Sequence, residues 1–116
     1  MQAVNEALDA GIFVVAAAGN NGNKDNINDV SIPANIPGVI AVGASTLDGK
    51  VWANSSVGSN INPYSNEERK FPNQKPEVTA PGVRMFSTAS TELTPPYAYS
   101  SGTSDSQPLS LLALLL

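Results

Sequence analysis

The sequence contains no cysteine and no histidine among its 116 residues. Without cysteine the chain has no disulfide framework, no zinc-thiolate site and no thiol nucleophile. The missing histidine excludes more, because most catalytic serines transfer their proton to an imidazole. Any nucleophilic serine in this chain must therefore obtain its base from another polypeptide segment.

Charged residues are also few, and ten acidic against six basic side chains give a formal net charge of -4. Nucleic-acid binding needs a cluster of Lys and Arg, and the nearest approach to one is the pair Arg69 and Lys70. The leucine-rich stretch 109–116 is shorter than the roughly twenty apolar residues that cross a bilayer. Residues 1–6 have neither the positively charged n-region nor the apolar h-region of a signal peptide. We therefore expect no nucleic-acid partner and no membrane span.

The apolar pattern predicts an α/β fold. Val4, Ala7 and Leu8 fall at helical spacing before Gly11, which predicts a short amphipathic helix over about residues 1–10. Continuous apolar runs predict strands buried on both faces, as in a parallel sheet. The expected strands are 12–18 and 39–44, with a further short strand at 52–56 and a partly exposed one at 83–88.

Polar segments separate these elements. Residues 24–31 and 58–76 are rich in Asn, Ser and charge, which predicts solvated loops to which we assign no chemistry. In an open parallel sheet, loops at the carboxyl ends of strands are where ligands bind. The first of these loops follows such a strand, so this end of the sheet is the expected functional edge.

The stretch 100–108 combines small polar residues with Gly102 and Pro108 before the leucines. It predicts a helix whose apolar run, 109–116, anchors it in a core. Two interpretations stand at this point. Ser104 is a nucleophile at the mouth of the helix, or the polar turn is ordinary helix capping.

Four segments in order carry a resemblance to a known family: 16–20 (AAAGN), 37–44 (PGVIAVGA), 79–83 (TAPGV) and 101–104 (SGTS). Together they resemble the subtilisin-like serine proteases, over essentially the whole chain. The resemblance implies a three-layer αβα fold with a mostly parallel sheet, of which residues 1–116 would form the C-terminal part of the catalytic domain. The family's triad runs Asp, His, Ser. A part that begins after the first two would lack histidine.

The resemblance assigns catalytic roles to two residues. Ser104 matches the nucleophile, whose hydroxyl attacks the scissile carbonyl after a histidine removes its proton. Asn20 matches the oxyanion-hole asparagine, whose side-chain amide acts together with the backbone N–H of Ser104 on the developing negative charge. The alternative for Asn20 is a turn residue in a left-handed conformation.

The resemblance also assigns residues that contact substrate. Ala17, Ala18 and Gly19 would form one wall of the pocket for the side chain that precedes the cleaved bond. Close packing of this strand under a helix is a compatible alternative. Gly102 and Thr103 lead into the nucleophile, Gly102 with backbone freedom and Thr103 with a local hydrogen bond.

A structural calcium ion is a further candidate, although no cofactor is required. Some subtilases bind a cation through backbone carbonyls near the segment that matches Ala34, Ile36 and Val39. No carboxylate cluster with calcium-ligand spacing accompanies it, and residues 25–29 lack the glycine and glutamate of an EF-hand loop. A solvated loop is the favoured interpretation there.

One position departs from the family pattern next to the nucleophile. Asp105 stands where the family usually has an apolar residue. A carboxylate suits the N-terminus of a helix, but it also places negative charge beside a site meant to stabilise one. The leucines that follow likewise replace small residues of the family's helix, so a change in its packing is expected.

The expected function is that of a secreted serine endopeptidase that cleaves polypeptides through an acyl-enzyme on Ser104. The chain alone is expected to be inactive and to need the missing N-terminal half of the domain as its partner. Half a parallel sheet exposes apolar edges, so self-association is also expected. The alternative is a catalytically dead, peptide-binding or structural module. Half of a nucleotide-binding domain is disfavoured, because residues 19–22 lack the phosphate-binding glycine fingerprint.

Overall fold

The computed structural model describes residues 1–22 and 29–115, so the predicted loop at 24–31 lies largely outside the described residues. Two helices and five strands follow one another along this part of the chain. In order they are α1 (Gln2–Asp9), β1 (Val15–Ala17), β2 (Ile40–Ser45), β3 (Val78–Pro81), β4 (Met85–Thr88), β5 (Tyr97–Ser100) and α2 (Thr103–Leu115).

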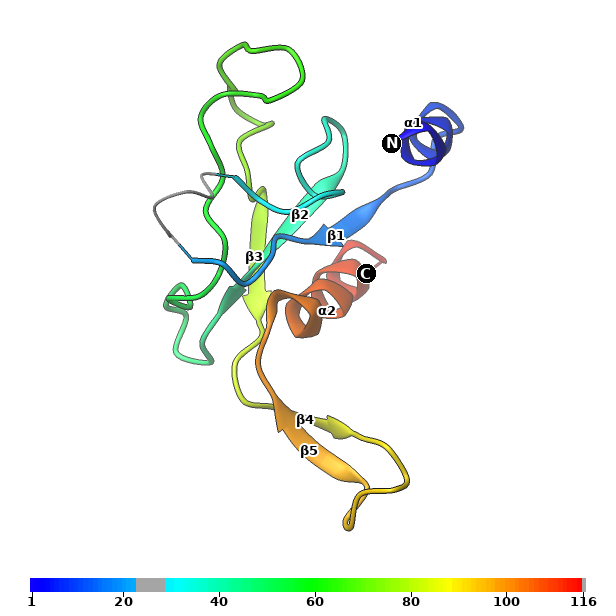
Figure 1. Ribbon diagram of the computed structural model, residues 1–116, viewed down its shortest axis with the longest axis vertical. Coiled ribbons are helices and arrows are strands. Elements are labelled where there is room, and N and C mark those ends of the chain that lie inside the picture. Colours follow the sequence, from blue (N-terminus) through cyan, green and yellow to red (C-terminus); the bar gives the residue numbers. More distant parts are fainter. Residues whose placement is uncertain (23–28, 116) are drawn as a thin grey trace.

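The centre of the molecule is a three-stranded parallel sheet in the order β1-β2-β3 (Figure 1). Val15 pairs with Ile40, and Val42 pairs with Val78. Helix α2 packs against all three strands. The predicted α/β class with a parallel sheet is confirmed, and the parallel pairing explains why the central strand β2 is almost entirely buried.

Helix α1 covers a second part of the core. Its partly buried residues Val4 and Leu8 pack against a cluster of small apolar side chains that includes Ala18, Ile36 and Val39. The helix ends as predicted, because Gly11 follows it with a φ of 79°, a left-handed conformation that glycine adopts without steric cost.

The strand limits correct the sequence prediction in three places. Only 15–17 of the run 12–18 forms a strand, and Ile12 and Phe13 are 57% and 81% exposed, because the partner strand begins only at Ile40. The prediction of a strand at 52–56 is wrong. The N–H of Ser55 donates to the carbonyl of Trp52, which makes a turn there. Residues 78–81 form the third parallel strand, which the sequence did not indicate as one.

The predicted apolar anchor of α2 is also wrong. Leu112 and Leu114 are 55% and 56% exposed, whereas Thr103, Ser106 and Ser110 are buried. The helix therefore turns its small polar side chains to the sheet. The reason is close approach, since a Cβ on Gly82 would lie 1.9 Å from the Ser106 hydroxyl oxygen. Leucine side chains would not fit that distance.

Strands β4 and β5 form an antiparallel hairpin that extends away from the sheet along the long axis of the molecule (Figure 1). Its aromatic side chains contact one another, with the Phe86 ring 5.1 Å from that of Tyr99 and 5.8 Å from that of Tyr97. At the base of the hairpin, the N–H of Gly102 donates to the carbonyl of Gly82 at 2.8 Å. The chain therefore leaves the sheet and returns at one point.

Candidate active site

Two segments more than eighty residues apart meet at the carboxyl end of β1. The N–H of Thr103, the first residue of α2, donates to Oδ1 of Asn20 at 2.9 Å. The Thr103 hydroxyl donates to the same oxygen at 3.1 Å and accepts from the N–H of Gly19 at 3.0 Å. Because these hydrogen bonds hold the strand end against the helix N-terminus, the predicted residues Gly19, Asn20 and Thr103 form one cluster.

The Asn20 carboxamide has a defined orientation. Both donors from Thr103 reach its Oδ1, so its Nδ2 is the end that remains to donate. This nitrogen lies beside Gly102, where a Cβ would be 3.3 Å away from it. Gly102 thus leaves room for an amide donor at the mouth of α2.

Ser104 is the second residue of α2 and is exposed. No described residue forms a hydrogen bond with its hydroxyl. Its backbone N–H belongs to the first turn, where N–H groups lack partners within the helix and the helix dipole favours negative charge. A serine hydroxyl, a free N–H and the Asn20 amide therefore occupy the same end of the helix.

Asp105 lies at this mouth as well. One of its carboxylate oxygens, Oδ2, accepts a hydrogen bond from the Ser100 hydroxyl at 2.9 Å. The same oxygen would be 3.6 Å from a Cβ on Gly102, the position that also approaches Asn20. The carboxylate is thus held near the amide donor without a hydrogen bond to it.

The segment before Asn20 has two sides. Ala18 is fully buried in the core cluster, whereas Ala17 and Gly19 are partly exposed. Gly19 has a φ of 108°, and a Cβ there would lie 2.3 Å from the Ser31 hydroxyl oxygen and 2.9 Å from that of Ser56. Any larger residue at position 19 would displace those serines. The role of this segment as a pocket wall remains a prediction.

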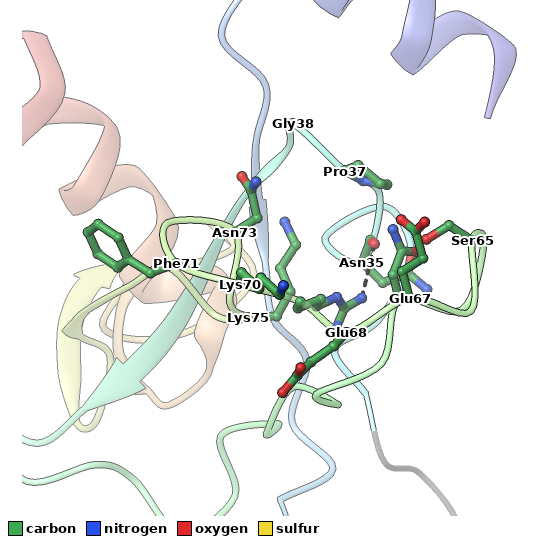
Figure 2. Close-up of a pocket in the computed structure, with 12 residues that line it drawn as sticks. Asn35, Pro37, Gly38, Ser65, Glu67, Glu68, Lys70, Phe71, Asn73 and Lys75 are labelled. Carbon is green, nitrogen blue, oxygen red and sulfur yellow. Dashed lines mark hydrogen bonds between the residues drawn. The ribbon is translucent and has the colours of Figure 1, made fainter.

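A polar cavity of about 650 Å³ lies elsewhere, between the turn around Pro37 and the loop 62–75 (Figure 2). None of the predicted site residues lines it. Arg69 lies on the cavity wall and forms a bidentate ion pair with Asp29, with nitrogen to oxygen distances of 2.7 and 3.0 Å. Burial raises the pKa of Asp29, but hydrogen bonds from Arg69 and from backbone N–H groups outweigh it and lower that pKa overall.

Sequence reasoning missed the buried cations of this loop. It treated 58–76 as solvated, yet the side chains of Arg69 and Lys75 are 4% and 1% exposed. Their partners Asp29 and Glu77 are the signal that pairing was available, but Asp29 is forty residues from Arg69. In the described residues, no group of three or more Asp or Glu could hold a metal ion.

Comparison with known proteins identifies the family. The model of the subtilase family matches residues 1–111. The chain belongs to the subtilase family. It is 40% identical to subtilisin DY of Bacillus licheniformis over 87 residues, which cover 75% of this chain and 26% of that protein. It is 36% identical over 110 residues to an extracellular protease of Xanthomonas campestris, covering 91% of this chain and 16% of that protein.

Solved structures agree with this subtilase assignment. The patellamide maturation protease PatG superposes with a TM-score of 0.70 at 27% identity, over 95% of this chain and 29% of PatG. The chain therefore spans less than a third of the length of each of these relatives. Among its described helices, none is both long enough and apolar enough to cross a membrane.

Proposed function

We propose that this chain carries the nucleophile and two oxyanion donors, a side-chain amide and a backbone N–H, of a serine endopeptidase that acts on polypeptides. The observation that carries the proposal is the attachment of the Asn20 carboxamide to the N-terminus of α2 through its oxygen, with its NH₂ directed to the mouth where Ser104 lies. Ordinary helix capping uses a side chain next to the helix in sequence, whereas this amide comes from a strand end eighty-three residues away.

The proposed reaction is acyl transfer to Ser104. The Ser104 oxygen attacks the carbonyl carbon of the peptide bond, and the hydroxyl proton passes to a histidine contributed by the rest of the domain. The carbonyl oxygen becomes negative in the tetrahedral intermediate and receives hydrogen bonds from Asn20 Nδ2 and the Ser104 N–H. Collapse of the intermediate breaks the C–N bond, and the leaving amine takes its proton from the histidine. Water then gives a proton to the histidine and attacks the acyl carbon, which releases the acid and restores the Ser104 hydroxyl.

We further propose that the 116 residues alone are inactive. The chain has no histidine, so no imidazole in it can take the Ser104 proton. Within the proposal, a segment that carries the family's Asp and His is the partner, and the partly exposed Ala17 and Gly19 line the approach of the substrate. Ala18, Gly102 and Thr103 are buried and would support this surface from behind. Secretion, the habit of the family, is proposed for the whole protein.

A second candidate function is a peptide-binding module without catalysis. Asp105 favours it, because its carboxylate lies near the proposed oxyanion donor. Negative charge at that place opposes the charge that develops on the substrate oxygen. Labelling of Ser104 separates the two candidates.

The first experiment uses a fluorophosphonate probe and casein. The chain alone should show neither labelling nor hydrolysis. Mixed with a chain that carries the family's Asp and His, it should be labelled at Ser104, and Ser104→Ala should abolish the labelling. Ser87→Ala is the matched control, since Ser87 is an exposed serine on the hairpin strand β4.

Two results would count against the proposal. Labelling of the isolated chain at a rate typical of intact proteases would overturn its inactivity. If a stable complex with the partner chain leaves Ser104 unlabelled, the protease proposal is overturned and the peptide-binding module is favoured.

The second experiment removes the oxyanion donor in the complemented enzyme. Asn20→Ala should lower kcat by about 10²–10³ with little change in KM, a magnitude measured for this donor in subtilisin itself and not obtained from this chain. Asn21→Ala is the neighbouring control and should leave kcat within about twofold, because Asn21 donates a hydrogen bond to the Ser56 hydroxyl through its backbone N–H, which the substitution keeps. Equal losses in both variants would place the effect in the turn and not in the amide.

A further inference from the structure

The turn that the family resemblance associates with a cation is contacted by a cationic side chain from a distant segment, that of Lys75. Lys75 lies three residues before the start of β3, and its side chain is 1% exposed. Its Nζ donates a hydrogen bond to the carbonyl oxygen of Val39, and it lies 2.7 Å from Oε1 of Glu77. Of the three candidate carbonyls, those of Ala34, Ile36 and Val39, the last therefore already has an ammonium group in front of it.

The neighbouring groups leave little for a metal ion to bind. The Ile36 carbonyl accepts the N–H of Val39 at 3.2 Å. The other oxygen of Glu77, Oε2, accepts the N–H of Ala41 at 2.8 Å. A second cation placed at Val39 would meet the charge of Lys75 at close range in a buried site, where repulsion is weakly screened. The residues present do not fit a calcium ion.

The backbone that carries the ammonium group is closely packed. A Cβ on Gly58 would lie 2.1 Å from the Lys75 carbonyl oxygen and 2.5 Å from its Cβ, so the 58 segment packs directly over this residue. Pro76, the next residue, comes within 3.2 Å of where a Cβ on Gly43 would lie, in the middle of β2. Lys75 is thus fixed between the turn, β2 and the covering loop, with its position in the cavity wall shown in Figure 2.

We propose that Lys75 is a built-in cation for the 36–39 turn, and that its removal leaves a site for a small cation between the Val39 carbonyl and the Glu77 carboxylate. Both groups are hard oxygen donors of the kind that bind calcium and the alkali ions. The ion pair also positions β2. Lys75 donates to the carbonyl of Val39 and Glu77 accepts from the N–H of Ala41, and these two residues flank the first residue of the strand. The inference does not depend on the protease proposal.

The test compares two substitutions in the full chain. Lys75→Ala removes the charge and the stem and opens the space, whereas Lys75→Met removes the charge and keeps the space filled. Thermal unfolding is followed by the fluorescence of the single tryptophan, Trp52. Each chain is measured in calcium chloride, in methylammonium chloride and in choline chloride at equal ionic strength.

Both variants should unfold at a lower Tm than the parent chain. Calcium or methylammonium, at about a hundred times the dissociation constant, should raise the Tm of Lys75→Ala by at least about 5 °C over choline and should leave Lys75→Met unchanged. Lys50→Ala is the matched control, since Lys50 pairs with Asp48 at 3.2 Å but is 82% exposed. It should show a small loss that no cation restores.

The opposite results overturn the proposal. A Lys75→Ala chain whose Tm responds equally to calcium, methylammonium and choline lacks the site. A Lys75→Ala chain that stays unfolded with calcium and methylammonium present contradicts it too. So does a calcium-specific rise in Tm of the same size in Lys75→Met, because that variant has no space for an ion.

Discussion

At its start α2 is hydrogen-bonded to two other segments of the chain, whereas its later described turns carry leucines that are exposed to solvent. Thr103 is hydrogen-bonded to Asn20 and Gly19, and Gly102 just before it to Gly82. Leu112, nine residues further on, is 55% exposed. The more apolar half of the helix is the less buried one. Close contact and specific hydrogen bonds, not apolar content, decide how this helix lies on the sheet.

The largest effect is expected from Gly82→Ala. The added Cβ would be 1.9 Å from the Ser106 oxygen and 2.6 Å from the carbonyl oxygen of Gly102, and the second of these is backbone that cannot rotate away. We expect a loss of about 3 kcal/mol in the free energy of unfolding, from displacement of the whole first turn. Urea unfolding followed by Trp52 fluorescence measures it.

Gly102→Ala is the graded comparison for that change. Its Cβ would meet the end of the Asn20 side chain at 3.3 Å, and this amide can shift by a few tenths of an ångström. The stability loss should be clearly smaller than for Gly82→Ala. Equal losses would mean that the helix is not positioned by its contact with Gly82.

The next effect is expected from Thr103→Val, which keeps the shape and removes the hydroxyl. The N–H of Gly19 then loses its acceptor, and Oδ1 of Asn20 loses one donor. We expect a loss of about 2 kcal/mol, the cost of a buried polar group without its partner. Thr88→Val on the exposed strand β4 is the control and should change stability by less than about 0.5 kcal/mol. A matching loss there would show that the effect is not specific to the first turn.

The smallest effect is expected from Leu112→Ser in the exposed half. Stability should change by less than about 0.5 kcal/mol, because the side chain is more than half exposed. Self-association should fall, since an exposed apolar residue is replaced by a polar one. Size-exclusion chromatography over a concentration series checks it. Ser110→Leu, two residues away and on the buried face, is the contrast and should destabilise the chain. A stable Ser110→Leu chain would erase the difference between the two faces.

Much of the sheet was predictable from local patterns. The runs around 15–17 and 40–45 are apolar on every residue or nearly so, which is what burial on both faces of a parallel strand requires. The third strand was hidden, because Val78–Pro81 is short and ends in proline. The meeting of Asn20 with the start of α2 followed from motif order and not from any local signal.

The packing of α2 and the buried cations could not be read from the sequence. A helix with leucine on most sides gives no periodic sign of the face it will bury, and here that choice depends on a glycine twenty-four residues before Ser106. The loop 58–76 has a solvated composition, yet two of its cations are buried because Asp29 and the Val39 carbonyl reach them from distant segments. Composition predicts the average exposure of such a loop, but its contacts with distant segments determine which of its side chains are buried.

The hairpin β4–β5 leaves the sheet after Gly82 and returns at Gly102, and these two residues are hydrogen-bonded to each other. Residues 83–101 therefore form a loop that is closed at its base, whatever its length or tip. Lengthening such a loop costs little, since each doubling adds only about 0.6 kcal/mol of closure entropy. The tip around residues 89–96 is thus a place where new sequence can be inserted while the serine keeps its position, and a region free to diversify among relatives.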